Sequence, residues 1–443
     1  MDLEKIRQKT TGMVLQFSIP AIIAMVLTSM ITVVDGFFIG NYVGEDGIAA
    51  VNLGLPVIYL FLSVGLMVSV GGVAMAGMSL GAGNIAECNQ VFRQTITTTI
   101  VFSVLTGVLV ALFFNPMLDI LGAAGQVRAY FKTYYGILLL ELIVMVVNSS
   151  FGMFIRGEGN PQYYMKVNIV SVVINIALDY VFAVIFHMGV AGIAFASLIS
   201  AMVSFGLILY FFLKRANVYH LGRFAFSADV LKRTLGNGSS EFIGEMSTGI
   251  AMFAYNYVIM RRIGVNGVTA FTIVGYVSYV FSMIVVGFGQ GASPLISFSY
   301  GAKERGLAKK IRKKTNQLVF AIGAVVFCVM AILSGWYSGL FVKSDTIREM
   351  VQSGMMIFMV SFFFSGINAI TSFYFTSIGN AVESAVISLS RGLVVLLICI
   401  FLLPAYFGMT GVWLAAPVTE IITILISGAM VHCDKKLFVG AKR

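Results

Sequence analysis

The sequence predicts an all-α integral membrane protein whose twelve transmembrane helices form two six-helix lobes. This prediction depends on the composition, on the length of the apolar runs and on an internal repeat. Of the 443 residues, 59% are hydrophobic and 11% are charged, and the mean hydropathy is +0.95. Such a composition excludes a water-soluble globular protein. Apolar runs of about 20 residues recur along the chain, which is the length of a helix that crosses a bilayer.

Twelve such runs can be drawn, and they are too long for the short alternating strands of a membrane β-barrel. The longest gap between them, after the sixth run, is rich in charged residues and reads as a linker. We expect the spans at 13–39, 48–79, 91–114, 128–153, 163–186, 189–213, 235–261, 267–298, 315–337, 348–375, 384–404 and 409–431.

An internal repeat divides the chain into two halves. When the sequence is shifted by 220 residues, the segment SLGA matches SYGA, and a loop dipeptide GN matches a second copy at 379–380. Because each half holds an even number of spans, the halves have the same orientation and are related by a pseudo-twofold axis along the membrane normal. The predicted units are an N-lobe at 1–213, a cytoplasmic linker at 214–234 and a C-lobe at 235–443.

Lysine and arginine are distributed unevenly among the loops. With the N-terminus inside, 22 of them lie on the cytoplasmic side and six lie outside. Since short cytoplasmic loops collect positive charge, both termini are predicted to be cytoplasmic. The basic segment 303–314 should face anionic lipid headgroups. This topology explains the net charge of +10 without nucleic-acid binding, which we do not expect.

The residues that usually bind metals or carry catalysis are sparse. The four cysteines are scattered and the three histidines are isolated, so the sequence indicates neither a disulfide framework nor a zinc site. There is no P-loop, so an ATP-driven pump would need another subunit. An intramembrane enzyme is conceivable, but an HExxH motif, or a GxSxG motif with a partnered histidine, is missing. No cofactor is expected.

Asp35 interrupts the first apolar run, in the stretch IPAIIAMVLTSMITVVDGFFIG at 19–40. An acid at the centre of a transmembrane helix costs about 3 kcal/mol on translocon scales. Such residues usually face a water-filled cavity or carry a function. Asp35 is therefore the first candidate for a functional residue.

Several motifs resemble those of the multidrug and toxic compound extrusion (MATE) family of prokaryotic transporters, within the superfamily that includes lipid flippases. They are Pro20 with Asp35 and GFFIGNYVG, the loops SLGAGN and SYGAKE, RGEGNPQ at 156–162 and NIALDYVF at 175–182. The resemblance covers nearly the whole chain. It implies a monomer in the cytoplasmic membrane that alternates access between two sides. It also implies an N-lobe cation site, carried over by position to Asp35, Asn175, Asp179 and the hydroxyl of Ser197.

The same four residues can be read physically. Asn175 and Asp179 are four apart and project from one face of a helix. Counting about 1.5 Å per residue from the outer span ends puts Asp179 and Ser197 roughly 12 Å deep and Asp35 roughly 8 Å deep. Two carboxylates, an amide and a hydroxyl suit a hard cation such as Na⁺, or a shared proton. The alternative is that each merely joins helices, since interhelical hydrogen bonds contribute about 0.6 kcal/mol on average.

Other charges fall within the expected spans. Glu241 and Glu245 are four apart in the first turns of the seventh span, and they are candidates for a C-lobe cation or substrate site, unless Glu241 lies at the interface. By the rise per residue, Arg391 and Glu420 lie at depths in the membrane that differ by at most roughly 6 Å, which favours a structural ion pair. Glu141 has no assigned partner and is kept as a possible substrate contact.

Together these features predict a secondary active transporter that exports amphipathic, cationic organic compounds in exchange for Na⁺ or H⁺. A flippase for lipid-linked saccharide precursors is the alternative, because fold is shared more widely than substrate. Pro20 is a candidate hinge, since an interior proline weakens a helix, although a first-turn proline would cause no kink.

Overall fold

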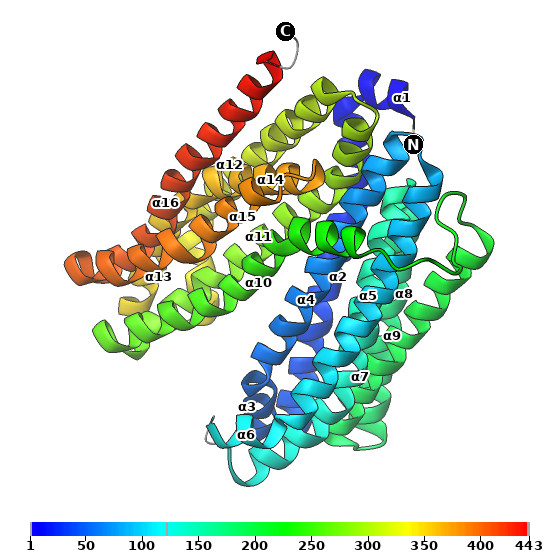
Figure 1. The fold of residues 1–443 in the computed structure, drawn as a ribbon. Helices are drawn as coiled ribbons and strands as arrows, with labels where there is room; N and C mark the ends of the chain where they lie inside the picture. Colours follow the sequence, from blue (N-terminus) through cyan, green and yellow to red (C-terminus); the bar gives the residue numbers. More distant parts are fainter. Residues whose placement is uncertain (1, 121–122, 441–443) are drawn as a thin grey trace.

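The computed structural model describes residues 2–120 and 123–440, and within these residues the chain is helical without strands. Two bundles of long helices form a V, and both termini lie on the side where the bundles meet (Figure 1). The first bundle holds α1 (Leu3–Gln8), α2 (Thr10–Tyr42), α3 (Glu45–Leu53), α4 (Leu55–Gly81), α5 (Ile85–Leu112), α6 (Phe114–Ile120), α7 (Gly125–Glu158), α8 (Pro161–Asp179), η1 (Tyr180–Ile185) and α9 (Gly189–Lys214). The second bundle holds α10 (Ala228–Arg262), α11 (Val265–Gly301), α12 (Arg305–Phe341), α13 (Asp345–Phe358), η2 (Met359–Ser361), α14 (Phe362–Ser377), α15 (Ala381–Leu389), η3 (Ser390–Val394) and α16 (Val395–Gly440).

The predicted twelve spans are present, although length and hydropathy alone identify only ten membrane-spanning helical segments among the described residues. One such segment, Ala381–Asp434, has 54 residues and is far longer than a single crossing needs. Its backbone turns at Gly408, with φ 55° and ψ −132°, so it contains two spans. The remaining span is α10, whose first half carries Asn, Ser and Glu residues that lower its hydropathy.

The backbone repeats at the same spacing as the sequence. The turn after α2 and the turn after α10 contain glycines with matching positive φ, Gly44 at 98° and Gly264 at 92°. Gly159 at 104° and Gly379 at 83° match in the same way after α7 and α14. Positive φ is the left-handed region that glycine adopts at little cost, so these four positions explain the loop glycines of the repeat.

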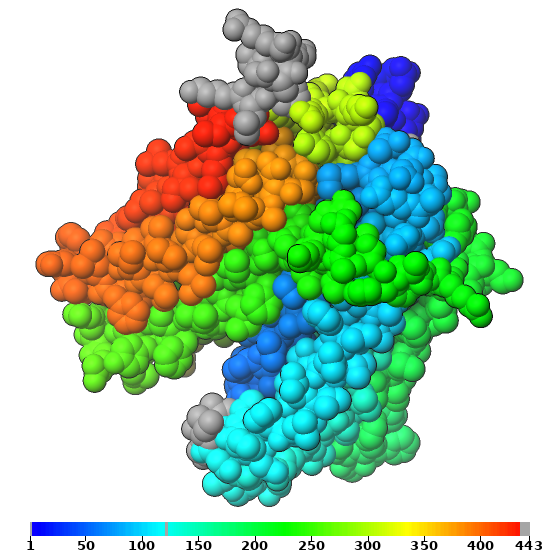
Figure 2. Space-filling model, viewed as in Figure 1, coloured from blue at the N-terminus to red at the C-terminus, as the bar shows by residue number. Residues whose placement is uncertain are grey.

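The lobes meet through close backbone contacts on the side of the termini. Helix α4 packs on α10 and α11, and α2 packs on α11. A Cβ atom at Gly71 would overlap the carbonyl oxygen of Thr234, and one at Gly291 would overlap the backbone of Ser18. Gly71 and Gly291 are 220 residues apart, so the repeat supplies both halves of this contact. On the opposite side the lobes diverge and leave a deep cleft (Figure 2).

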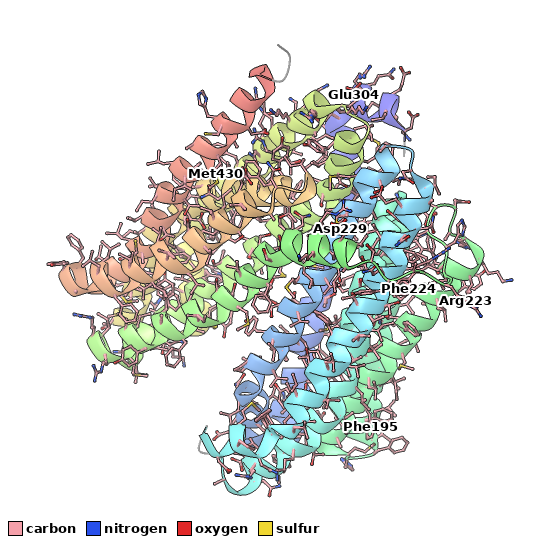
Figure 3. All side chains as sticks on the ribbon, viewed as in Figure 1. Phe195, Arg223, Phe224, Asp229, Glu304 and Met430 are labelled. Carbon is pink, nitrogen blue, oxygen red and sulfur yellow. The ribbon has the colours of Figure 1, made fainter. Side chains whose placement is uncertain are left out.

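The linker between the lobes is held against the N-lobe. It runs over 215–227, so the last seven residues of the predicted linker belong to α10. Asn89 and Arg93 donate to linker carbonyls at 2.8 Å, and Gln94 exchanges hydrogen bonds with the backbone of Ser227 at 2.8 and 3.1 Å. Figure 3 shows Arg223 and Phe224 on this linker at the edge of the N-lobe. The polar face of α5 thus fixes the linker.

Candidate functional site

Three helices of the N-lobe bring the four predicted site residues together. Asp35 lies on α2, Asn175 and Asp179 lie on α8, and Ser197 lies on α9. Helix α8 packs against both α2 and α9. It ends at Asp179, where the π-helical turn η1 (Tyr180–Ile185) begins, and such turns are frequent at functional sites. All four side chains are buried, with exposed fractions between 0% and 7%.

A chain of hydrogen bonds links these residues. The amide Nδ2 of Asn175 donates to Ser197 Oγ at 3.3 Å, and Ser197 Oγ donates to Asp35 Oδ2 at 3.1 Å. The carboxyl groups of Asp35 and Asp179 lie within hydrogen-bonding reach of each other. Two carboxyl groups can share a hydrogen bond only when one of them carries a proton. The geometry therefore allows a single proton, or a cation in its place, between them.

The cluster has more acceptors than donors. Asp35 Oδ1, Asn175 Oδ1 and both carboxyl oxygens of Asp179 are buried without a hydrogen-bond partner. None of the ion pairs in the described part of the chain involves either aspartate. A buried acceptor left without a partner costs about 1–3 kcal/mol. Four orphaned oxygens in one cluster fit a proton or a hard cation, which prefers oxygen ligands.

The cluster lacks the nitrogen and sulfur ligands that a zinc-like metal prefers. Within residues 2–120 and 123–440, no group of three or more His, Cys, Asp or Glu side chains is arranged to hold a metal ion. The ligands that Asp35, Asn175 and Asp179 offer are all oxygens. They match a monovalent coupling ion better than a transition metal, which prefers nitrogen or sulfur ligands.

Two further residues approach the cluster from α7. Tyr134 is buried within electrostatic range of Asp35 and Asp179, and the half-buried Glu141 is within electrostatic range of Asp35. The sequence indicated no partner for Glu141, and Tyr134 was not among the candidates. A signal was available, because the two residues are seven apart and so lie on one face of a helix. Which helix that face meets could not be read from the sequence.

Pro20 lies inside α2 and not in its first turn, because the helix begins at Thr10. The alternative of a first-turn proline is therefore wrong. Proline has no N–H, so the carbonyl of Gln16 loses its usual helical partner. Two residues before Pro20, Ser18 touches Gly291 of the C-lobe, while Asp35 lies further along the same helix. Pro20 thus separates a lobe contact from the carboxylate cluster.

In the C-lobe, Glu241 and Glu245 lie further along their helix than expected. Helix α10 begins at Ala228, so both glutamates follow more than three full turns and are not in its first turns. Both side chains are half-buried, and neither makes a hydrogen bond with a described residue. Glu245 lies within electrostatic range of Tyr59 on α4 and Tyr279 on α11, which themselves are related by the 220-residue repeat.

The predicted ion pair between Arg391 and Glu420 is confirmed. Arg391 donates from Nη2 at 3.0 Å and from Nε at 3.3 Å to Glu420 Oε1. Asn368 Nδ2 donates to the other carboxyl oxygen of Glu420 at 2.7 Å, and Ser427 Oγ donates to Asn368 Oδ1 at 2.8 Å. Every charge in this network has a partner, so it reads as structural.

Comparison with known proteins assigns the chain to a family. The MatE family model matches residues 20–181 and 243–402, one segment in each lobe, and so covers well over half of the chain. The chain belongs to the MatE family. The first MatE segment contains Asp35, Asn175 and Asp179, and the second contains Glu245 and Arg391.

Similar MatE proteins have been described as multidrug exporters. The multidrug export protein MepA of Staphylococcus aureus strain bovine RF122 / ET3-1 is 24% identical over 424 residues, covering 94% of this chain and 92% of MepA. MepA of Staphylococcus saprophyticus is 21% identical over 420 residues, with the same coverage of 94% and 92%. The protein is therefore a multi-pass membrane transporter of a multidrug efflux family.

Solved structures share the MatE fold. A MATE protein in complex with MaL6 superposes with a TM-score of 0.90 at 23% identity, covering 96% of this chain and 97% of that one. An outward-facing multidrug resistance MATE transporter gives the same values. A MOP superfamily transporter from Pyrococcus furiosus, described as having a binding pocket of reversed polarity, gives 0.88 at 22% identity with 94% coverage of both chains. These likenesses show the two-lobe fold with twelve helices.

Proposed function

We propose that the protein is a secondary active antiporter that exports amphipathic organic cations in exchange for Na⁺ or H⁺. The observation that carries this proposal is the pair of buried carboxylates, Asp35 and Asp179, with four oxygen atoms of the cluster left without partners. A structural charge would be neutralised by a neighbour, as Glu420 is by Arg391. Unpaired acids in a membrane helix bundle instead suit an ion that binds and leaves.

The lobe geometry supports alternating access. The lobes touch on the side of the termini and diverge on the other side (Figure 2). With both termini cytoplasmic in the inner membrane of a bacterium, this cleft opens to the outside. Helix α2 contacts the C-lobe through Ser18 and carries Asp35 in the N-lobe cluster. Bending at Pro20 when Asp35 binds or loses its cation then connects ion binding to the movement of the lobes.

The C-lobe acids support a cationic substrate. Glu241 and Glu245 are half-buried without hydrogen-bond partners among the described residues, and Tyr59 and Tyr279 lie near Glu245. Carboxylates attract organic cations directly, and aromatic faces attract them through the ring quadrupole. The arginine in this region, Arg391, is ion-paired with Glu420. This charge balance favours an organic cation over an anionic lipid-linked saccharide.

Transport in proteoliposomes tests the proposal. A fluorescent cationic dye is followed while the Na⁺ gradient and the proton gradient are imposed separately. We expect one gradient to drive dye movement, and Asp35→Asn to abolish it while dye binding remains, because the amide keeps the shape but cannot exchange a charge. Asp46→Asn, an exposed acid in the first turn of α3, is the matched control. Native-rate transport by Asp35→Asn under the same gradient would contradict the mechanism.

Cysteine labelling tests the orientation. In a variant without the exposed Cys328 and Cys433, we introduce Arg223→Cys on the linker or Tyr406→Cys, which is 76% exposed near the turn at Gly408. In intact cells an impermeant thiol reagent should label position 406 and not position 223. The reverse pattern would place the termini outside.

A further inference from the structure

Arg156 is a buried cation without an acidic partner at the contact between the lobes. It lies near the end of α7 and is 2% exposed. Its Nη2 donates to Gln290 Oε1 on α11 of the C-lobe at 2.9 Å, and the ring of Tyr164 lies 5.1 Å from its Cζ. Its Nε and Nη1 have no partner, and no ion pair of the described residues includes it. A buried charge of this kind is unfavourable until a counter-charge is supplied.

A small cavity adjoins Arg156. Its polar lining consists of Arg156 from the N-lobe with Gln290 and Ser293 from the C-lobe, and the rest is apolar. The centre of a water molecule could occupy about 20 Å³ of this cavity. A cavity needs about 10–15 Å³ by this measure to hold one water molecule. The cavity therefore has room for one or two water molecules or ions of similar size, and it is too small for an organic substrate.

The polar groups around this cavity are mainly donors. Arg156 retains its unpartnered N–H groups, and Gln290 Nε2 makes no hydrogen bond with a described residue, because only its Oε1 is bonded. Ser377 Oγ donates to the carbonyl of Phe373 at 2.6 Å, so Ser293 Oγ donates its one O–H to Ser377 Oγ at 2.7 Å and the unused donors are those of Arg156 and Gln290. The lining includes no carboxylate. Unused donors, a full positive charge and a small volume all suit a small anion.

We propose that the cavity beside Arg156 and Gln290 binds a small monovalent anion of about the size of chloride. The anion supplies the counter-charge that none of the described residues gives to Arg156. Because Arg156 belongs to the N-lobe and Gln290 to the C-lobe, the site is complete only while the lobes meet on this side. An anion that binds only this arrangement stabilises it by mass action. The site is distinct from the carboxylate cluster and does not depend on which cation drives transport.

Thermal unfolding of the full-length protein in detergent tests this proposal. Chloride, and separately bromide, replaces gluconate at constant Na⁺ concentration, pH and ionic strength. We expect the Tm to rise with halide concentration and to saturate. Arg156→Gln should lose this response because the charge is gone, and Gln290→Leu should weaken it because one donor is gone. The second variant keeps the test informative if the first one folds poorly.

Arg312→Gln is the matched control. Arg312 also has its Nε and Nη1 buried without hydrogen-bond partners and stacks on a tyrosine, Tyr374, at 4.8 Å, but it does not line this cavity. Its variant should keep the halide response of the native protein. In addition, crystals soaked in bromide should show an anomalous peak beside Arg156. A Tm that does not change with halide, as expected if the cavity holds only water, would overturn the proposal, as would an unchanged response in both Arg156→Gln and Gln290→Leu.

Discussion

The two lobes have equivalent backbone folds, but their charged residues lie at different positions. With the shift of 220 residues, Asp35 and Asp179 of the N-lobe correspond to Tyr255 and Cys399 of the C-lobe. Tyr255 and Cys399 are buried in an apolar cluster with Val395, which corresponds to Asn175. The position that holds two unpaired carboxylates in one lobe is therefore hydrophobic in the other. The fold provides equivalent positions, and the side chains alone decide where an ion can bind.

The C-lobe charges show the complementary pattern. Asn368 is the repeat partner of Asn148, and each donates to a backbone carbonyl at 2.9 Å, of Glu420 and Ala201 respectively. In the C-lobe this shared contact also includes the carboxylate of Glu420, which is neutralised by Arg391. In the C-lobe the equivalent asparagine thus contacts a paired charge, whereas the unpaired carboxylates of the N-lobe have no charged counterpart in the C-lobe.

The largest expected effect comes from neutralising the unpaired acids. Asp179→Asn should abolish gradient-driven export, because the cluster can no longer exchange a full charge. At the corresponding C-lobe position, Cys399→Ala should leave transport near the native rate. Dye export from vesicles measures both. Equal losses in the two variants would mean that the lobes do not differ in coupling.

The next effect concerns the backbone contact that the lobes share. A Cβ atom at Gly238 would overlap the carbonyl oxygen of Met67, whereas one at Gly236 on the same helix meets nothing within 4 Å. Gly238→Val should therefore force the lobes apart on the side of the termini, at a cost of about 1–3 kcal/mol. Spin labels at the exposed Ala86 and Gly306, which are 220 residues apart, should report a longer distance than in Gly236→Val. Identical distances would show that the contact adapts without movement of the lobes.

Stability should distinguish the paired from the unpaired carboxylates. Glu420→Gln leaves Arg391 without its counter-charge, and the loss should approach about 3 kcal/mol, the lower range for breaking a buried pair, since Arg391 is partly exposed. Asp179→Asn removes a charge that has no partner, so its Tm should equal or exceed that of the native protein. Thermal unfolding in detergent measures both. A Tm for Asp179→Asn that falls as far as that of Glu420→Gln would mean that Asp179 is structural.

The smallest expected effect is that of the helix prolines. Pro20 lies within α2, and the corresponding residue of α10 is Ser240, so only the N-lobe helix has this weak point. Pro20→Ala should slow transport by about fivefold, the lower range of typical coupling, because α2 bends less readily. Pro417→Ala in α16 is the control and should have little effect. A native transport rate in Pro20→Ala would show that Pro20 is not a hinge.

The sequence by itself determined the membrane class, the twelve spans, the repeat and the candidate residues. Lipid cannot solvate a charge, so Asp35, Asp179 and the pair Arg391 and Glu420 are conspicuous in apolar runs whatever the packing. Helical geometry then sets which near neighbours share a face, which is why Asn175 and Asp179 could be placed together. These inferences depend only on local spacing and on the solvent.

Only the tertiary structure decided which distant residues meet. A helix that is apolar on all sides gives no periodic signal of the face that packs. The approach of Tyr134 and Glu141 to Asp35, and the fit of Gly238 against Met67, therefore depend on how the helices cross. The same is true of Arg156, which donates to Gln290 and forms no ion pair with a described residue. Whether a buried charge has a partner is a property of helix crossings, and spacing along the chain does not encode it.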